Sequence, residues 1–469
     1  MKVLFIQNFL HAYYGVMSIS AVLKKAGHQT EMHIVDKNED VTEIVKNAAP
    51  DIIAFSCTTA LYPIGLEQSK KIKSKFNIPI IFGGVHATIC PEIIDEGSID
   101  IVCRGEGEYA FLELLKKMEK GDDITGIQNL WVKKYGAIHK NDMRNFIENL
   151  DELPFPGREI YYSKYPYLRN QPAKTFFLGR GCPYQCTFCI NKTYMELYRG
   201  KGRYIRRRST ENIINEILEV KEKYGLEAIY FNDDTFTLSK EWLFSFLEEY
   251  KKKINLPFTC GSRAGLITEE MIKKLKEANC YCIEMGVETG NEKTRITILG
   301  KTETDQSILN AAHLIKNAGI KLKTSNMMCL PGETAELALE TIRFNSKIKA
   351  DFMNCSLLQP YPLLGITKYA IDNGFLDTDF DYNSLGRLSY FETPIKLKDK
   401  RQIMNMQKLF YLGVWFPFTI PLIKRISKLP LKIIFDMLFK GMYIYSYARY
   451  HQLNIINVLK LAMHSRKLV

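Results

Sequence analysis

The sequence alternates short apolar runs, typical of β-strands, with stretches of helical periodicity, and this alternation fills two long blocks of the 469-residue chain. Strands that alternate with helices predict a parallel, doubly wound sheet with helices on both faces. Such strands are buried on both sides, which fits their nearly continuous apolar composition here. In the first block, residues 1–125, the apolar runs lie at residues 3–7, 31–35, 52–56, 78–82 and 99–103.

The five runs of the first block suit a flavodoxin-like strand order, with a ligand crevice at the carboxyl ends of the strands. Two further β-type runs flank Tyr135-Gly136 within residues 126–147, and they predict a small hairpin. A proline-bearing stretch at residues 150–157 is the best domain boundary.

The second block, residues 172–395, repeats the rhythm through six strand–helix units. Six such units predict a partial (β/α)6 TIM-type barrel, whose functional residues lie at the carboxyl ends of its strands. The sequence thus predicts an α/β chain in four parts. They are a flavodoxin-type domain at 1–147, a linker at 148–171, a barrel at 172–395 and a helical C-terminal region at 396–469.

Three cysteines, Cys182, Cys186 and Cys189, lie within eight residues just after the first predicted barrel strand. Thiolates are the usual ligands of iron–sulfur clusters. No fourth cysteine is nearby, so a four-iron cluster here would keep one iron open to a Lewis-basic ligand. The alternatives are a zinc knuckle or unrelated core cysteines. Zinc would need a fourth Cys or His at short spacing, and residues 191–193 offer none.

This C-x3-C-x2-C loop, with the aromatic Phe188 before its last cysteine and a partial barrel around it, resembles the radical S-adenosylmethionine (SAM) superfamily. The resemblance covers about residues 172–370. It implies that Cys182, Cys186 and Cys189 are the metal ligands of a catalytic 4Fe-4S cluster whose open iron binds SAM. It also implies that reduction of SAM gives a 5′-deoxyadenosyl radical, and that the protein excludes water and holds a substrate C–H bond close.

The same resemblance extends to residues at other strand ends. It implies that Arg263 and Glu288 contact the carboxylate, amine or ribose of SAM, and the two charges of SAM suit such a pair. Phe188 is expected beside the adenine, and Asp233 and Asp234 are expected to bind SAM or substrate. For the charged residues, the structural alternative is an interstrand salt bridge or a helix N-cap.

A flavodoxin-like domain ahead of such a barrel resembles the cobalamin-binding subclass of the superfamily. The resemblance implies that Ser56, Gly83, Gly84 and Gly105 form the floor under a corrin ring, because small residues admit a flat macrocycle. His86 is expected to touch the cofactor, and a solvated loop histidine is the alternative. The D-x-H-x-x-G motif of cobalamin mutases is absent, as is usual in this subclass. A domain that binds nothing, or only substrate, remains the alternative.

The composition indicates in which compartment the protein works and which class of partner it lacks. The eleven cysteines show no regular pairing, and no signal peptide precedes them, so we expect a reducing, cytoplasmic compartment. Of the net charge of +12, residues 401–469 carry +10, with eleven basic residues against one acid. The charge therefore belongs to an apolar tail rather than to a polar patch, and no nucleic-acid partner is expected.

The tail itself is basic and aromatic. Residues 409–423 carry no charge but contain Pro417 and Pro421, and residues 431–450 are amphipathic. A spanning helix needs about 20 apolar residues, so this region is too short and kinked to cross a bilayer. The composition is typical of segments that lie in a membrane interface. The alternative is a helical cap that buries its apolar face on the barrel.

Taken together, the first hypothesis is a cobalamin-dependent radical SAM methyltransferase that methylates an unactivated carbon of a small, lipid-like molecule. The second is a radical SAM cyclase or rearrangement enzyme that transfers no methyl group, like the related anaerobic cyclases. The third, of another class, is a membrane-associated iron–sulfur electron-transfer protein. The enzyme hypotheses imply a one-electron reductant of flavodoxin or ferredoxin type, and they allow peripheral contact with the inner face of the cell membrane through residues 401–469.

Overall fold

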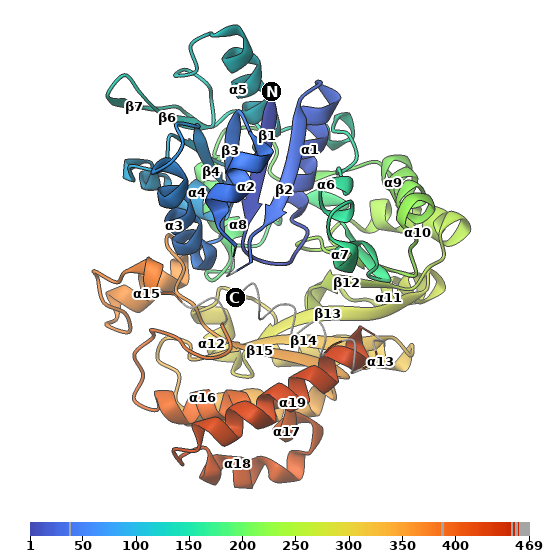
Figure 1. Cartoon of the computed structure of the whole chain (residues 1–469). Helices are drawn as coiled ribbons and strands as arrows, with labels where there is room; N and C mark the ends of the chain where they lie inside the picture. The colour runs from blue at the N-terminus through green and yellow to red at the C-terminus, as the bar shows by residue number, and fades with distance from the viewer. Residues whose placement is uncertain (37–38, 386–388, 452–453, 455–457, 459–469) are drawn as a thin grey trace.

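The computed structural model describes the chain except residues 37–38, 386–388, 452–453, 455–457 and 459–469. Two sheets organise the described residues: a seven-stranded sheet in the N-terminal half and a six-stranded sheet in the C-terminal half (Figure 1). A two-stranded ribbon, β9 and β10, stands beside them. The predicted α/β class is confirmed.

The seven-stranded sheet has the order β2-β1-β3-β4-β5-β6-β7. Its first five strands pair in parallel, as the flavodoxin-like order requires. The predicted hairpin forms from β6 and β7 and adds antiparallel to β5, so it extends the sheet. The strands are β1 (Lys2–Gln7), β2 (Gln29–Ile34), β3 (Ile52–Ser56), β4 (Ile80–Gly83), β5 (Ile101–Cys103), β6 (Leu130–Lys134) and β7 (Ala137–Lys140).

Helices cover both faces of this sheet because its strands are apolar on both sides. Val3 and Phe5 of β1 pack in one cluster with residues of α1 and α5, whereas Leu4 and Ile6 pack in another with residues of α2 and α3. The helical elements are α1 (Tyr14–Lys25), α2 (Val41–Ala48), η1 (Thr59–Leu61), α3 (Tyr62–Lys73), α4 (Val85–Ile89), η2 (Pro91–Asp95) and α5 (Glu108–Lys120).

The linker is folded rather than extended. It forms η3 (Leu150–Glu152), α6 (Glu159–Tyr162) and α7 (Pro166–Arg169). Tyr161 is fully buried against the first sheet, and its hydroxyl donates to Gln7 Oε1 at 2.8 Å. Burial of this aromatic side chain ties the linker to the N-terminal domain.

The second sheet has the order β15-β14-β13-β12-β11-β8, and all neighbours are parallel, as predicted for a partial β/α barrel. Its strands are β8 (Ala173–Phe176), β11 (Ala228–Phe231), β12 (Phe258–Ser262), β13 (Cys280–Glu288), β14 (Lys321–Met328) and β15 (Phe352–Leu357). The short ribbon pairs β9 (Gly179–Arg180) with β10 (Arg206–Arg207).

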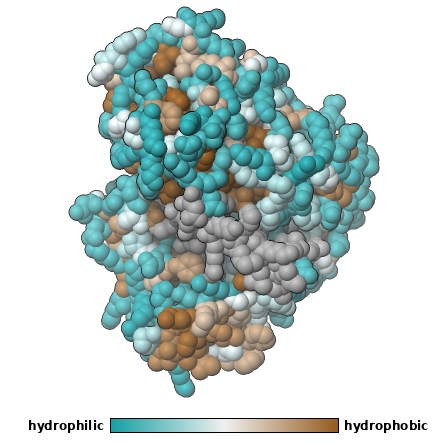
Figure 2. Space-filling model, viewed as in Figure 1, coloured by the Kyte–Doolittle hydropathy of each residue, from teal (hydrophilic) through white to brown (hydrophobic). Residues whose placement is uncertain are grey.

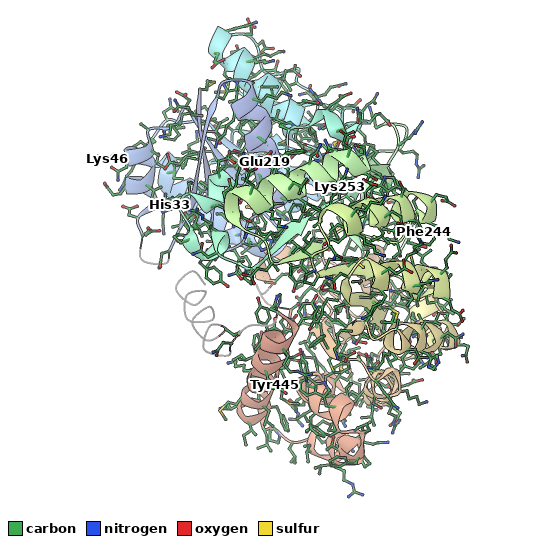
Figure 3. The ribbon with its side chains drawn as sticks, turned by 90° about the vertical axis from the view of Figure 1, so that its right-hand side faces the viewer. His33, Lys46, Glu219, Phe244, Lys253 and Tyr445 are labelled. Carbon is green, nitrogen blue, oxygen red and sulfur yellow. The ribbon has the colours of Figure 1, made fainter. Side chains whose placement is uncertain are left out.

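Helices cover the outer face of the half-barrel, and several begin at a serine or threonine N-cap, as at Ser209, Thr304 and Thr334. In Figure 3, Glu219 and Phe244 mark α9 and α10 on this side of the molecule. The helical elements are α8 (Ile190–Leu197), α9 (Thr210–Tyr224), α10 (Lys240–Lys253), η4 (Ala264–Leu266), α11 (Glu269–Glu277), α12 (Glu292–Thr297), α13 (Asp305–Asn317), α14 (Ala335–Ile348), α15 (Gly365–Asp372) and η5 (Tyr382–Ser384).

The described part of the C-terminal region is helical, as predicted, whereas residues 452–453, 455–457 and 459–469 of this prediction lie outside the described residues. It consists of α16 (Lys400–Lys408), α17 (Phe410–Trp415), η6 (Pro417–Thr419), α18 (Ile420–Ile426) and α19 (Lys432–Tyr450). Ile403, Phe410 and Phe439 are buried in one cluster with Ile342 of α14 and Cys355 of β15. This region therefore caps the β14–β15 end of the half-barrel. Within the described residues, no helix is long and apolar enough to span a membrane.

Candidate active site

The three cysteines lie in the loop between β9 and α8. The side chains of Cys182 and Cys186 are buried, and Cys189 is half-buried at the start of α8. The backbone amide of Cys189 donates to Cys186 O at 3.1 Å, which closes a tight turn between them. Thr187 anchors this turn through a 3.0 Å backbone hydrogen bond to Leu299 O.

Each thiol faces a different neighbour. Cys182 Sγ is 3.5 Å from Thr235 Oγ1, just beyond β11, and Cys186 Sγ is 3.4 Å from Nη1 of Arg263, just beyond β12. These contacts place the loop over the carboxyl edge of the barrel, where β/α barrels hold their active sites. Within the part of the chain described, no three His, Cys, Asp or Glu side chains converge on a single metal ion. A four-iron cluster does not need three side chains on one metal ion, because each thiolate binds a different iron.

Arg263 reaches the cysteine loop but already has a carboxylate partner. Its Nε donates to Glu303 Oε1 at 2.8 Å, and Nη2 bonds the second oxygen of the same carboxylate. The guanidinium also stacks 3.7 Å above the ring of Tyr184, inside the loop. Glu303 thus holds the guanidinium of Arg263 in a two-point ion pair. The third nitrogen, Nη1, points at Cys186 Sγ.

Glu288 ends β13 in a left-handed backbone conformation, with φ of 68°. Burial raises the pKa of its carboxyl, and the ammonium of Lys301, 3.4 Å from Oε1, opposes that rise. A non-glycine residue in this conformation is uncommon, and it marks a strand end that turns sharply toward the site. Lys301 belongs to the same segment as Glu303, so both pairs share one supporting element.

The two aspartates after β11 differ in setting. Asp233 is buried, accepts the amide of Leu178 at 3.1 Å and lies 3.6 Å from Arg207. Burial raises its pKa to about 6, which Arg207 counteracts. Asp233 therefore joins two strand ends of the barrel, as the salt-bridge alternative expects. Asp234 instead lines the cavity described next.

A cavity of about 510 Å³ lies between the N-terminal sheet and the barrel. This volume is in the range of cofactor sites. Strand ends of the first sheet form one wall, the linker prolines form part of another, and the segment just before Cys182 faces them. Tyr194 of α8, Tyr198 at the end of α8 and Tyr204, just before β10, give the cavity aromatic sides.

Of the residues expected at the corrin floor, Ser56, Gly83, Gly84 and Gly105 all line this cavity. Their small size, however, also serves the protein's own packing. A Cβ on Gly84 would lie 2.9 Å from Cys57 O, and one on Gly105 would overlap the hydroxyl of Tyr198. Tyr198 Oη accepts the amide of Glu106 at 2.9 Å, so Gly105 admits an aromatic side chain from the barrel side.

His86, expected at the cobalamin, and Phe188, expected beside the adenine of SAM, are not among the residues that line this cavity. The His86 ring packs on Tyr62 with centroids 4.4 Å apart, and its Nδ1 is 3.2 Å from Thr59 Oγ1. Burial lowers its pKa to about 4, and it is not among the residues that line the cavity. Phe188 packs against the apolar cluster around Leu330 and Leu364. The histidine is thus a neutral packing residue rather than a solvated loop residue.

A network of ion pairs joins the two domains across the cavity. Arg180 of β9 donates to Glu106 at 2.7 Å and to Glu108 at 2.6 Å, and Arg206 of β10 pairs with Glu106 at 2.8 Å. Sequence analysis missed Arg180, Arg206 and the Glu303 and Lys301 partners, because these contacts join distant segments. The sequence feature that could have pointed to these ion pairs is the presence of two carboxylates, Glu106 and Glu108, just after β5.

The residues fit the cofactors expected of them. The cavity borders the cysteine loop and has aromatic, apolar walls, as a large flat ring requires. The three thiols lie at the barrel mouth next to Arg263. Together, the fold and the site define an enzyme with a cysteine-loop half-barrel joined to a ligand-binding α/β domain.

Comparison with known proteins identifies both parts. The family model "Radical SAM superfamily" matches residues 176–344, and "B12 binding domain" matches residues 8–115. The "Uncharacterized methyltransferase PH0819" of Pyrococcus horikoshii is 30% identical over 72% of this chain and 73% of its own. The chain therefore belongs to the radical SAM superfamily, with a B12-binding domain ahead of the barrel. Its cofactors are accordingly a 4Fe-4S cluster, SAM and cobalamin.

Two further proteins are similar over most of the chain. The "Anaerobic magnesium-protoporphyrin IX monomethyl ester cyclase" of Rubrivivax gelatinosus is 24% identical over 84% of this chain and 73% of its own. The solved structure of the cobalamin-dependent S-adenosylmethionine radical enzyme OxsB, with aqua-cobalamin and S-adenosylmethionine bound, shares the fold. It has a TM-score of 0.65 and 18% identity, and the match covers 100% of this chain and 79% of that one.

Proposed function

We propose that this radical SAM enzyme is a cobalamin-dependent methyltransferase that methylates an unactivated carbon of a small, lipid-like molecule. The observation that carries the proposal is the interdomain cavity, which borders the B12-binding strand ends on one side and the cysteine loop on the other. The similarity to a protein named as a methyltransferase supports the same assignment. When bound, SAM and cobalamin would supply a hydrogen-abstracting radical and a transferable methyl group.

The chain's own residues would hold and orient these groups. Cys182, Cys186 and Cys189 would bind the cluster as thiolates, and Arg263 would stabilise the negative charge of Cys186, whose Sγ lies 3.4 Å from its Nη1. Glu288, at the end of β13, would bind the amine or ribose of SAM through its largely buried carboxylate, which lies 3.4 Å from Lys301.

The positions of the remaining candidate residues support further proposed roles. Asp234 would face the shared cavity from the barrel, and Ser56, Gly83, Gly84 and Gly105 would lie beneath the corrin. Asp233 would act by positioning the β8 and β11 ends, and Phe188 by supporting the cluster loop. His86 would have no contact with the cofactor, because its ring packs on Tyr62.

The proposed functional division of the chain keeps the predicted limits. Residues 1–147 would bind cobalamin, 148–171 would link the parts, 172–395 would hold the cluster and SAM, and 396–469 would form the basic helical tail. A small-molecule substrate and an external reductant suit a radical SAM enzyme. We propose a flavodoxin- or ferredoxin-type reductant in the cytoplasm, and contact of the tail with the inner face of the cell membrane.

The experiment is an anaerobic assay of protein reconstituted with iron, sulfide and cobalamin. With SAM and reductant, it should release 5′-deoxyadenosine, and with a substrate it should also release S-adenosylhomocysteine. SAM carrying a deuterated methyl group should transfer that label to the product. The Cys186→Ala variant should lose 5′-deoxyadenosine release, and the exposed-site variant Lys221→Ala should retain it. Release of neither compound by the wild-type protein would exclude the proposal.

Ring formation or rearrangement without methyl transfer is the second candidate, favoured by the similarity to a cyclase over 84% of this chain. Product mass separates the two, because methyl transfer adds one CH2 unit. 5′-Deoxyadenosine without S-adenosylhomocysteine, in the presence of a converted substrate, would favour the second candidate.

A further inference from the structure

Helix α19 is apolar on two faces, and the protein covers only one of them. Phe435 and Phe439 are buried against α16, α17 and β15. On another face, Ile433 and Met437, one helical turn apart, are 76% and 60% exposed. A helix that is hydrophobic all round normally has an apolar environment on every side.

The exposed face continues onto the preceding elements. Phe418 of η6 is 81% exposed, and its ring lies 6.2 Å from that of Phe416. We call this set the C-terminal apolar surface. Its members are Phe416, Phe418, Leu422, Leu429, Leu431, Ile433, Ile434, Met437, Leu438 and Tyr445. Figure 2 shows hydrophobic side chains gathered at the lower end of the molecule, and Figure 3 places Tyr445 on α19 in that region.

Positive charge surrounds this surface. Residues 416–440 contain five basic side chains and one acid, Asp436. Asp436 already pairs with Lys432 at 2.8 Å and with the buried Lys408 at 3.6 Å. Arg425 and Lys428 are exposed beside Leu422 and Leu429 in the sequence. Lys424 pairs with Glu336 of α14 at 2.7 Å, and the remaining excess of basic side chains keeps the local field cationic.

The surface is held in place by the fold. Asn405 of α16 donates to Ser427 O at 2.8 Å and to Leu429 O at 3.1 Å, which fixes the α18–α19 connection. Trp415 contacts Tyr445 edge to face, with ring centroids 5.9 Å apart. Ordering this surface on contact would therefore cost little conformational entropy.

We propose that the C-terminal apolar surface docks on an anionic lipid bilayer as a peripheral membrane site. Apolar and aromatic side chains flanked by lysine and arginine match the interface of a negatively charged leaflet. A second copy of the chain fits less well, because symmetric pairing would bring two cationic surfaces together. This inference deepens the proposed contact of the tail with a membrane, and it does not depend on the reaction catalysed.

Helix α19 would connect the docked surface to the barrel. Its last residue, Tyr450, donates to Glu284 inside the barrel sheet, and Lys323 lies 4.0 Å above the Tyr450 ring. The next residue, His451, bonds the hydroxyl of Tyr230 at 2.7 Å. One helix therefore joins the docking surface to the base of the half-barrel.

The test is sedimentation of the full, reconstituted chain with vesicles of phosphatidylcholine alone, or with about one third phosphatidylglycerol. The wild-type protein should bind the anionic vesicles at least about tenfold more tightly than the neutral ones. The triple variant Phe418→Ser, Ile433→Ser, Met437→Ser should lose about tenfold or more in anionic vesicle binding. Arg425→Gln with Lys428→Gln should weaken binding and reduce its salt dependence.

Matched controls lie far from the surface. Tyr135→Ser removes a side chain that is 79% exposed on the β6–β7 turn, and Lys25→Gln with Lys221→Gln removes two exposed charges. Neither control should change vesicle binding. Circular dichroism and 5′-deoxyadenosine release, measured on every variant, separate loss of docking from misfolding or from failure of the chemistry.

Three results would overturn the inference. They are no binding of wild-type protein to anionic vesicles, equal loss in the triple variant and the Tyr135→Ser control, or a stable wild-type dimer that the triple variant converts to monomer. The last result would assign the surface to a second copy of the chain.

Discussion

At the residue scale, Gly84 shows how a single position shapes the cavity between the two domains. Its φ is 89°, and an added Cβ would lie 2.9 Å from Cys57 O and 3.0 Å from Cys57 N. A side chain there is strained both by conformation and by contact with backbone that cannot move aside. The cavity wall at the β4 end therefore depends on glycine.

We predict that Gly84→Ala destabilises the protein by about 2 kcal/mol and weakens cobalamin binding. Gly97→Ala is the matched control, because a Cβ at Gly97 meets nothing within 4 Å. Chemical denaturation and a cobalamin titration measure the two effects. Equal behaviour of the two alanine variants would contradict the account of this wall.

Glu333, just after β14, carries a buried carboxyl whose Oε1 has no hydrogen-bond partner among the described residues. Burial raises its pKa to about 8 from the usual value near 4.5. Between these values the unfolded chain releases the proton while the folded chain keeps it, so stability falls as the pH rises through this window.

We predict that the melting temperature of wild-type protein falls more between pH 5 and pH 8 than that of Glu333→Gln, which mimics the protonated acid. Thermal scans of both proteins across this range provide the measurement. Parallel pH profiles would show that Glu333 does not titrate differently on folding.

At the scale of elements, the β9–β10 ribbon binds the barrel to the N-terminal domain. We predict that Arg180→Met costs about 2 kcal/mol in stability and loosens cobalamin, because it removes the arginine partner of the buried Glu108 and leaves Glu106 with Arg206 alone. Lys368→Met is the control, since the Lys368–Asp372 pair is exposed and such pairs contribute little. Unfolding curves measure the loss of stability in each variant. An equal loss in both would show that the ion pairs of the ribbon do not hold the two domains together.

The sequence predicted these elements unevenly, for physical reasons. Buried strands such as β3 follow from continuous apolar runs, because burial on both faces dictates composition. The pairing of Arg180 with Glu106, and of Arg263 with Glu303, joins residues 74 and 40 positions apart, and no local pattern encodes such contacts. Likewise, the tail was predicted as either a cap or an interfacial segment, whereas α19 buries one apolar face and exposes another.

At the scale of the whole molecule, residues of both domains line one cavity, so a ligand bound there would contact both domains and add to their stability. We predict that saturating cobalamin raises the unfolding free energy by about 3 kcal/mol at a hundredfold excess over its dissociation constant. Thermal denaturation with and without cobalamin measures this, and Gly84→Ala should show a smaller rise. An unchanged melting temperature in the wild-type protein would argue against cobalamin in this cavity.

The central claim is that Cys182, Cys186 and Cys189 hold a four-iron cluster with one iron open to SAM. The most direct measurement is electron paramagnetic resonance of the anaerobically reconstituted, reduced protein, before and after SAM is added, with metal analysis of the same sample. We expect about four irons per chain and a cluster spectrum that changes on addition of SAM. Zinc in place of iron, or a spectrum that SAM leaves unchanged, would contradict it.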